Sequence, residues 1–227
     1  MLNELLKLIP LLYATIALAY TGFLDFKSRE VDPKLWLIFL VPGIPISILF
    51  NYYLGDTILS LLSLTLSIPI VALTYIMYRL CMIGGADVLA LAFISIIAPY
   101  TPGSILPTLY ATILYSITPA LFYQLYSNMK VCRVTSIKCM LSLKHSIEAE
   151  RLLKDPSFKW WLIDYSGGCS IDEDKETIIA KASGGNLKTI LQASPGHPYV
   201  AHLSIGLILA IILRDYPIKI LIEALLL

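Results

Sequence analysis

Long stretches without any charged residue constrain this fold more than any other feature of the sequence. A helix needs about 20 apolar residues to cross roughly 30 Å of bilayer hydrocarbon, and several stretches reach that length. Across the chain, 57% of residues are hydrophobic and 15% are charged, against about 25% charged in soluble domains. This composition excludes an ordinary soluble domain and a disordered chain. The charge-free runs are Leu8–Leu24, Leu35–Gly55, Thr57–Tyr78, Val88–Met129 and Thr189–Leu213.

These runs predict six transmembrane helices. The run Val88–Met129 is too long for one helix, and Pro99, Pro102 and Gly103 divide it into two. The last helix is expected to begin near Tyr199, after a proline-rich stretch. The first run is longer than the apolar core of a signal peptide, about 7–15 residues, and no small-residue cleavage site follows it. We therefore expect the first run to be a membrane span.

Segment 128–198 has the composition of a soluble protein. Its pattern predicts a helix over Met140–Leu153 and short strands over Phe158–Tyr165 and Leu187–Gln192. The expected fold is an all-α polytopic membrane protein, with six transmembrane helices and a small α+β subdomain between helices five and six. The expected domains are 1–127 for the first five helices, 128–198 for the subdomain, and 199–227 for the sixth helix and an interfacial tail.

The distribution of lysine and arginine predicts the orientation. Fourteen of these residues lie on one side of the predicted topology, in turn 26–34, at Arg79 and in segment 128–198. The other side has only Lys7, Arg214 and Lys219. Because cytosolic loops carry an excess of positive charge, we expect a multi-pass plasma-membrane protein with both termini outside and these connections in the cytosol. The net charge of +1 gives no electrostatic reason to expect binding to nucleic acid.

The cysteines give no sign of a metal site. Cys81, Cys132, Cys139 and Cys169 form no Cys-x-x-Cys pair. Their spacing favours reduced thiols over a disulfide framework or a zinc site. The sequence therefore predicts neither a bound metal nor a cofactor.

Two aspartates lie at the cytosolic ends of predicted spans. Asp25 ends the first span and Asp87 begins the fourth. Acidic side chains at membrane depth usually face a bundle interior or a water-filled cavity. Two neighbouring carboxyl groups share one proton, so that one can act as a base and the other as an acid. Aspartic proteases hydrolyse peptides with such a pair.

Each aspartate also has a plainer interpretation. An aspartate at the end of a span is often an interfacial residue or a helix cap, and Asp87 follows Gly84-Gly85 where a helix begins. Paired intramembrane acids also occur in transporters of protons or cations. The surrounding sequence has to distinguish these possibilities.

That surrounding sequence resembles the type IV prepilin peptidases. The stretch from Asp25 to Pro33 is similar to their signature Asp-x-(basic)-x-Arg-x-(Ile/Val). Gly84-Gly85-Ala86-Asp87 resembles their Gly-x-Gly-Asp motif, with alanine at the third position. Archaeal preflagellin and prepilin peptidases accept a small hydrophobic residue there, so the departure favours that branch. The stretch from Pro195 to Val200, followed by Gly206, is similar to the start of the family's last helix.

The resemblance implies a membrane aspartic endopeptidase that removes short basic leader peptides, the class III signal peptides, from archaellin and type IV pilin precursors at the cytosolic membrane face. It implies Asp25 and Asp87 as the catalytic pair and Gly84 and Gly85 as supporting residues. Bacterial members carry a cysteine-bearing insertion after the first helix, and many also methylate the new N-terminus. This chain lacks that insertion, so we expect peptidase activity without methyl transfer.

Other residues near these motifs have weaker assignments. The acidic pair Glu30 and Asp32 is a candidate contact for the basic residues of a leader peptide, and a solvated turn is the alternative explanation. Lys27 and Arg29 match the signature, but positive-inside anchoring is the favoured explanation for them. Trp36 lies near a span end and is predicted to anchor the protein at the membrane interface.

Three rival functions use the same residues differently. A small proton- or cation-coupled transporter would use Asp25 and Asp87 without cleaving peptides. Such transporters often have two similar halves with broken helices at matching positions, and this sequence shows no convincing internal repeat. A presenilin-like protease has a similar Gly-x-Gly-Asp motif, but that family has a tyrosine directly before its first catalytic aspartate, where this chain has Leu24. An assembly scaffold would not need two buried acids. The predicted partners are therefore leader-bearing precursors and the lipid bilayer, and no nucleic acid.

Overall fold

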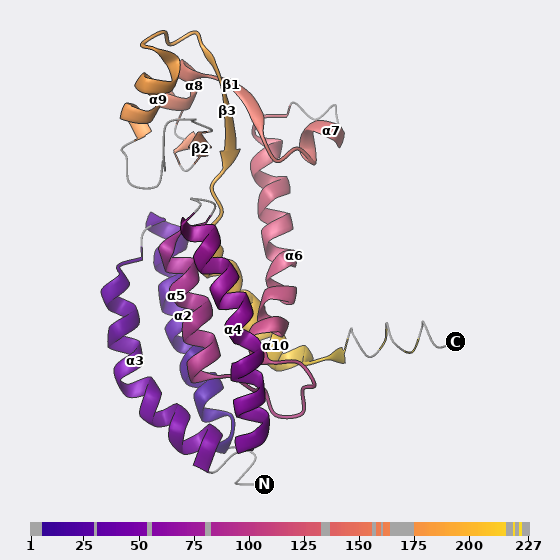
Figure 1. The fold of residues 1–227 in the computed structure, drawn as a ribbon. Helices are drawn as coiled ribbons and strands as arrows, with labels where there is room; N and C mark the ends of the chain where they lie inside the picture. The colour runs from indigo at the N-terminus through magenta and orange to yellow at the C-terminus, as the bar shows by residue number, and fades with distance from the viewer. Residues whose placement is uncertain are drawn as a thin grey trace. The chain divides into compact units, whose positions relative to one another are not determined.

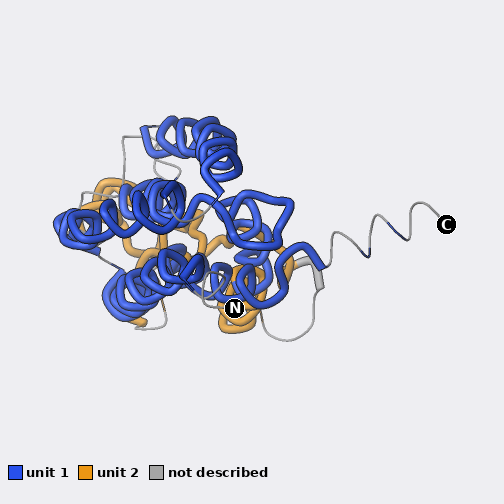
Figure 2. Tube along the Cα trace, turned by 90° about the horizontal axis from the view of Figure 1, so that it is seen from below, with its two compact units in different colours: residues 1–119, 198–227 blue, residues 120–197 orange. Residues whose placement is uncertain are grey.

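The computed structural model describes residues 6–29, 31–53, 56–79, 83–132, 137–155, 158–159, 161–163, 175–216, 220 and 223. The chain forms two compact units (Figure 2). The first unit contains residues 1–119 and 198–227, and the second contains residues 120–197. Each unit is described below by itself.

The first unit is built from helices that run up and down in succession (Figure 1). Helix α2 ends, and α5 and α10 begin, at the same end of the bundle. The π-helix η1 continues directly from α3. The elements are α2 (Ile9–Ser28), α3 (Pro33–Ser47), η1 (Ile48–Tyr53), α4 (Thr57–Arg79), α5 (Gly85–Ile97), the first half of α6 (Thr108–Met129) and α10 (Tyr199–Leu213).

Three stretches of helix are long and apolar enough to cross a membrane: Ile9–Ser28, Pro33–Tyr53 and Thr57–Arg79. The apolar helices α5 and α10 are shorter, with 13 and 15 residues. Helix α6 has 22 residues but is rich in tyrosine, threonine and serine, and it is not in this group. The described residues thus form a mostly helical protein with three candidate spans, and the count of six remains a prediction.

Helix α4 shows the burial pattern of a membrane helix. Its buried residues are Ser60, Ser63 and Ser67, whereas Ile58 and Leu62 are exposed. A soluble helix buries its apolar face, so this arrangement is reversed. The buried hydroxyls are satisfied locally, because Ser67 donates to the Ser63 carbonyl and Ser60 to the Asn51 carbonyl. The exposed apolar face suits a hydrocarbon environment, where backbone and hydroxyl groups must bond within the protein.

The core of the first unit is centred on α5. Ile94 and Ile97 are fully buried, and Phe93 packs on the ring of Trp36 from α3 with centroids 5.4 Å apart. The prediction that Trp36 anchors at the membrane interface is wrong, because its side chain is 1% exposed. The first turn of α3 points this ring toward α5. The position of a residue near the end of a span does not determine the direction in which its side chain points.

The predicted interruption after α5 is present. Helix α5 ends at Ile97 and α6 begins at Thr108, with Gly103 at φ +79° in the loop between them. The buried carboxylate of Asp215, just after α10, accepts hydrogen bonds from the Ser104 hydroxyl and the Ile105 N–H. This carboxylate ties the loop to the end of α10.

The second unit contains a three-stranded antiparallel sheet in the order β1-β3-β2. The strands are β1 (His145–Glu148), β2 (Trp161–Ile163) and β3 (Ile190–Pro195), and the short helices are α7 (Ile137–Met140), α8 (Ala149–Lys154) and α9 (Lys175–Ser183). In the register of β1 and β3, His145 is opposite Ala193. Leu152, Phe158 and Ile179 are almost fully buried in the core.

The prediction of one helix over Met140–Leu153 is wrong. Residues 145–148 form β1, in which His145 and Ile147 are buried and Ser146 and Glu148 are exposed. This alternation has the period of a strand, and only Ala149–Lys154 is helical in the second half of the segment. Of the predicted strands, Phe158–Tyr165 overlaps β2, and Leu187–Gln192 overlaps the start of β3. Residues 164–165 lie outside the described residues.

Two of the cysteines predicted to be reduced thiols are joined. Cys132 and Cys139 form a disulfide, with Cα atoms 5.9 Å apart. The Cys132 N–H bonds to the Asn128 carbonyl as α6 ends, and α7 returns Cys139 beside it. A search for short Cys-x-x-Cys spacing misses this pair, because its two cysteines are seven residues apart in the sequence. Cys81 and Cys169 lie outside the described residues.

Helices α2 and α10 approach through Gly22. A Cβ atom at this position would lie 3.0 Å from the Ala201 Cα and 3.3 Å from the Val200 carbonyl oxygen. Both atoms belong to backbone, so neither can move aside cheaply. The absence of a side chain at Gly22 therefore sets the distance between these two helices.

We expect Gly22→Val to destabilise the protein by about 2 kcal/mol, because the added side chain overpacks the α2–α10 contact. The matched control is Ala19→Val, which adds a valine to an exposed position of the same helix and should change stability by less than about 0.5 kcal/mol. Unfolding of both variants is measured in the same detergent. Equal stability of the two variants would contradict the close contact.

Candidate active site

Asp25 lies near the end of α2 and is 7% exposed. Its Oδ2 atom accepts hydrogen bonds from the backbone N–H groups of Val200 at 3.0 Å and Ala201 at 3.3 Å. These are the second and third residues of α10, whose N-cap residue, Pro198, makes no side-chain cap. The first N–H groups of a helix have no partner within it. Asp25 therefore caps α10 from a neighbouring helix.

The chain leaves α2 directly after Asp25. Arg29 adopts a left-handed conformation with φ +60°, and its N–H bonds to the Asp25 carbonyl oxygen at 2.9 Å. A left-handed residue is a common helix terminator, although usually a glycine. Lys27 is exposed in the last turn, where a positive charge complements the helix dipole. This sharp end keeps Asp25 on the final turn.

Asp87 lies in the first turn of α5 and is partly buried. Its Oδ2 atom accepts a hydrogen bond from the Gly84 N–H at 3.1 Å, and the Asp87 N–H donates to the Gly84 carbonyl at 3.2 Å. This reciprocal pair is a capping arrangement, so the plainer interpretation of Asp87 as a helix cap describes its position correctly. The capping uses only one carboxylate oxygen.

The structure brings Asp25 and Asp87 together. Helices α2, α5 and α10 pack against one another, and all three present the relevant termini at one end of the bundle (Figure 1). The two carboxylates lie within electrostatic range of each other. Asp87 also interacts electrostatically with Tyr199, the residue before Val200, to which Asp25 is bonded. The N-terminus of α10 is thus next to both acids.

Both carboxylates keep one oxygen for further contacts. Among the described residues, the hydrogen bonds to each side chain engage Oδ2. The Oδ1 atoms of Asp25 and Asp87 are therefore available to a water molecule or a substrate. Two neighbouring carboxyl groups can share one proton.

The two glycines before Asp87 have ordinary backbone angles. Gly84 has φ −76° and ψ 152°, and neither Gly84 nor Gly85 has a positive φ. Neither position therefore requires glycine for its backbone conformation. A Cβ at Gly84 would lie 3.3 Å from the Asp87 Oδ2 atom, and one at Gly85 would lie 3.3 Å from the Tyr78 ring. Their small size gives the carboxylate and the Tyr78 ring room.

Of the two acidic residues suggested for leader recognition, only Asp32 can be placed. Its side chain is exposed, and its Oδ1 atom accepts the Lys34 N–H at 2.8 Å as the N-cap of α3. The cap leaves its charge at the surface. Glu30 lies outside the described residues.

The first turn of α10 is the part of the site that residue-level reasoning missed. Val200 and Ala201 take part through backbone N–H groups, which no side-chain pattern reveals. The sequence did point to Tyr199, because this residue belongs to the stretch from Pro195 to Val200 that resembles the start of the family's last helix. Without coordinates, nothing connected that stretch to Asp25, 175 residues earlier.

Comparison with known proteins identifies the family but no individual relative. A model of the type IV leader peptidase family matches residues 12–125. This region is half of the chain and includes both aspartates, Gly84 and Gly85, whereas α10 lies beyond it. No curated protein and no solved structure matches the chain.

The match confirms the family that the motifs around Asp25 and Asp87 predicted. Membership also makes the chain a peptidase that processes leader peptides, and its apolar helices agree with a membrane protein. The chain therefore belongs to the type IV leader peptidase family.

Proposed function

We propose that this protein is an aspartic endopeptidase in which Asp25 and Asp87 together activate a water molecule. The observation that supports this most strongly is the meeting of two carboxylates from separate helices, each with one oxygen held by backbone N–H groups and one oxygen available. Family membership supplies the reaction class, leader-peptide hydrolysis.

The hydrogen bonds suggest different roles for the two acids. Asp25 accepts two N–H groups at the N-terminus of α10, and such donors favour a negative charge. Asp87 accepts one. We assign Asp25 as the base that removes a proton from water, and Asp87 as the acid that donates a proton to the scissile carbonyl oxygen.

The remaining steps return both acids to their starting states. Attack by water gives a tetrahedral intermediate with two hydroxyl groups. As the C–N bond breaks, the proton held by Asp25 passes to the leaving nitrogen, and a hydroxyl proton returns to Asp87. The products are a carboxylic acid and an amine, and the pair again holds one proton.

The substrates proposed are archaellin and type IV pilin precursors. Their short basic leaders remain in the cytosol while the following hydrophobic helix lies in the membrane. The positive charges around turn 26–34 support a cytosolic position for the end of α2. A site at that end of the bundle would meet the junction between leader and helix, with both chain termini outside.

The family match favours this proposal over the transporter alternative. Proton- or cation-coupled transport would use the same two aspartates, but a leader-peptidase family match accounts for them through hydrolysis. Cleavage of a precursor is therefore the experiment that separates the two functions.

We expect Asp25→Asn and Asp87→Asn each to lower the rate of cleavage of a purified basic-leader precursor by at least about 100-fold, the lower range for acid–base groups. An asparagine side chain still offers an oxygen to the backbone N–H groups, so both variants should fold. Cleavage is measured in detergent by the mobility shift of the precursor.

The matched control is Asp56→Asn. Asp56 is exposed and caps α4 through the Leu59 N–H, and asparagine is an equally good cap. Its cleavage rate should equal that of the unmodified protein. Full activity in Asp25→Asn or Asp87→Asn would remove that residue from the mechanism.

A second prediction concerns the leader. Asp32→Asn preserves the N-cap of α3 but removes an exposed negative charge, so it should raise KM for a basic-leader precursor about two- to fivefold, as expected for a surface charge pair. The kcat should not change. The effect should disappear at high salt and with a precursor whose leader lysines are replaced by glutamine. A KM increase that persists with the neutral leader would show that Asp32 does not recognise charge.

A further inference from the structure

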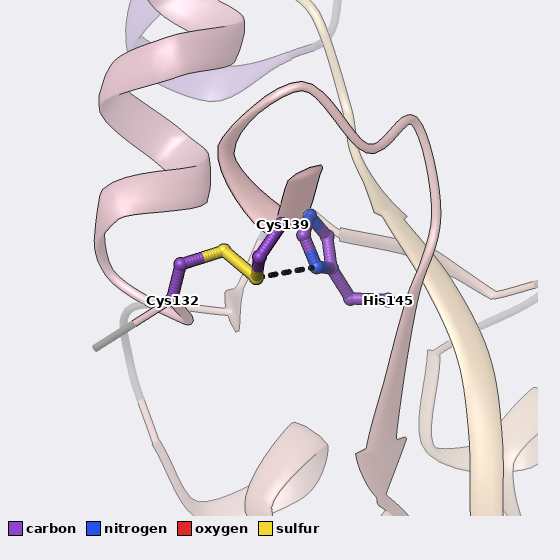
Figure 3. Close-up of side chains that lie close together, drawn as sticks. All are labelled: Cys132, Cys139 and His145. Atoms are coloured by element: carbon purple, nitrogen blue, oxygen red, sulfur yellow. Dashed lines mark hydrogen bonds between the residues drawn. A yellow bond between two sulfur atoms is a disulfide. The ribbon is translucent and has the colours of Figure 1, made fainter. Parts of the chain in front are cut away.

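A second group of reactive side chains lies in the second unit, separate in sequence from the two aspartates. Cys132, Cys139 and His145 face one another (Figure 3). Their sulfur and ring-nitrogen atoms all lie within 4.8 Å of one another, and the Cys139 Sγ is 3.9 Å from the His145 Nδ1. Cys132 and His145 are 4% and 6% exposed. Thiolate and imidazole are the ligands that zinc-class metal ions prefer.

The hydrogen bonds of Asn128 determine which nitrogen of His145 carries a proton. The Asn128 Nδ2 donates to the carbonyl oxygens of Met140 at 2.7 Å and Ser142 at 2.8 Å. Its Oδ1 therefore faces His145, whose Nε2 lies 2.9 Å away and must donate. The Nδ1 of the neutral ring then has a free lone pair, which is directed at the Cys139 sulfur.

This arrangement is the one that metal-binding histidines use. A ligating histidine donates its other N–H to an oxygen acceptor, which fixes the tautomer and the orientation of the ring. Asn128 supplies that acceptor and is itself fully buried. Gln124 donates to the same Oδ1 at 3.1 Å, so the acceptor is held in place by a second side chain. The support for a ligand is present before any ion binds.

The distances fit a tetrahedral ion with small movements. Zn–S bonds of about 2.3 Å and Zn–N bonds of about 2.0 Å place two sulfurs about 3.8 Å apart and a sulfur and a nitrogen about 3.5 Å apart. The observed sulfur–nitrogen distance of 3.9 Å is already close. The two sulfurs must separate, and the Cys132 Sγ, which lies within 4.8 Å of the ring nitrogen, must approach it. Cα atoms 5.9 Å apart permit these movements through side-chain rotation.

We propose that Cys132, Cys139 and His145 bind a zinc-class divalent ion when the disulfide is reduced, with water as the fourth ligand. Two molecules of a small thiol reduce the disulfide to two thiols and are themselves oxidised to one disulfide. Binding then releases the two thiol protons. Two thiolates neutralise the charge of the ion, which lowers the cost of burying it. The disulfide links the end of α6 to α7, and the metal ion would replace it with a link that also includes β1 through His145.

Cobalt binding to the full-length protein tests this proposal. The protein carries Cys81→Ser and Cys169→Ser, so that Cys132 and Cys139 are the remaining thiols. It is reduced with a phosphine in detergent and titrated with Co²⁺, which reports tetrahedral thiolate ligation through charge-transfer and d–d absorption bands. We expect one ion per chain, displacement by Zn²⁺, and no bands in the oxidised protein.

Variants distinguish ligands from neighbours. Cys132→Ser, Cys139→Ser and His145→Gln should each weaken Co²⁺ binding at least 100-fold. Asn128→Leu removes the acceptor behind the ring and should weaken it 10- to 100-fold, the usual effect of an outer partner. Glu148→Gln, at an exposed position of β1 outside the cluster, is the control and should bind normally. Size-exclusion profiles of all variants are compared to identify any that do not fold.

Three results would overturn the proposal. They are the absence of tetrahedral bands in the reduced protein, equal bands in the reduced and oxidised proteins, and binding that survives loss of both Cys132 and Cys139. Because the readout is metal absorption, its outcome is independent of leader cleavage.

Discussion

The hydrogen bonds between the Asp25 carboxylate and the first turn of α10 are the contact on which the candidate site depends. Pro198 provides no side-chain cap for this helix, and buried N–H groups left without a partner cost about 1–3 kcal/mol each. Asp25 supplies that partner from α2. The contact requires the two backbones to be close, and Gly22, one turn earlier on α2, permits it. One carboxylate therefore holds α10 in place with one oxygen and leaves the other for the proposed chemistry.

Asp87 repeats this arrangement at a second helix. It caps the start of α5 with one oxygen, just as Asp25 caps the start of α10. Two helix N-termini, each with a partial positive charge, thus converge on two carboxyl groups. Such a field suits a pair that carries one negative charge and one proton. In the sequence, capping and catalysis are competing interpretations of each aspartate. The two roles are compatible because each carboxylate has two oxygens.

The sequence was most informative where one residue type or one short motif determines the local structure or the chemistry. The motifs around Asp25 and Asp87 predicted the family correctly, and Pro99, Pro102 and Gly103 predicted the break between α5 and α6. It was least informative where tertiary contacts decide. Trp36 turns inward onto Phe93, β1 interrupts a predicted helix because pairing with β3 prevails over local pattern, and a disulfide joins Cys132 to Cys139. The N–H groups of Val200 and Ala201 have no side-chain signature. The catalytic roles of the two aspartates remain predictions.

The central claim is that Asp25 and Asp87 meet at one end of the bundle, and crosslinking in the membrane tests it most directly. Asp25→Cys and Asp87→Cys are combined in a chain whose four native cysteines are serine, and a short bifunctional thiol reagent is added to isolated membranes. The account predicts efficient intramolecular crosslinking of this pair. It predicts none between Asp25→Cys and Asp56→Cys, because Asp56 precedes α4 at the other end of the bundle. Failure of the first pair to crosslink, with both thiols reactive, would contradict the account.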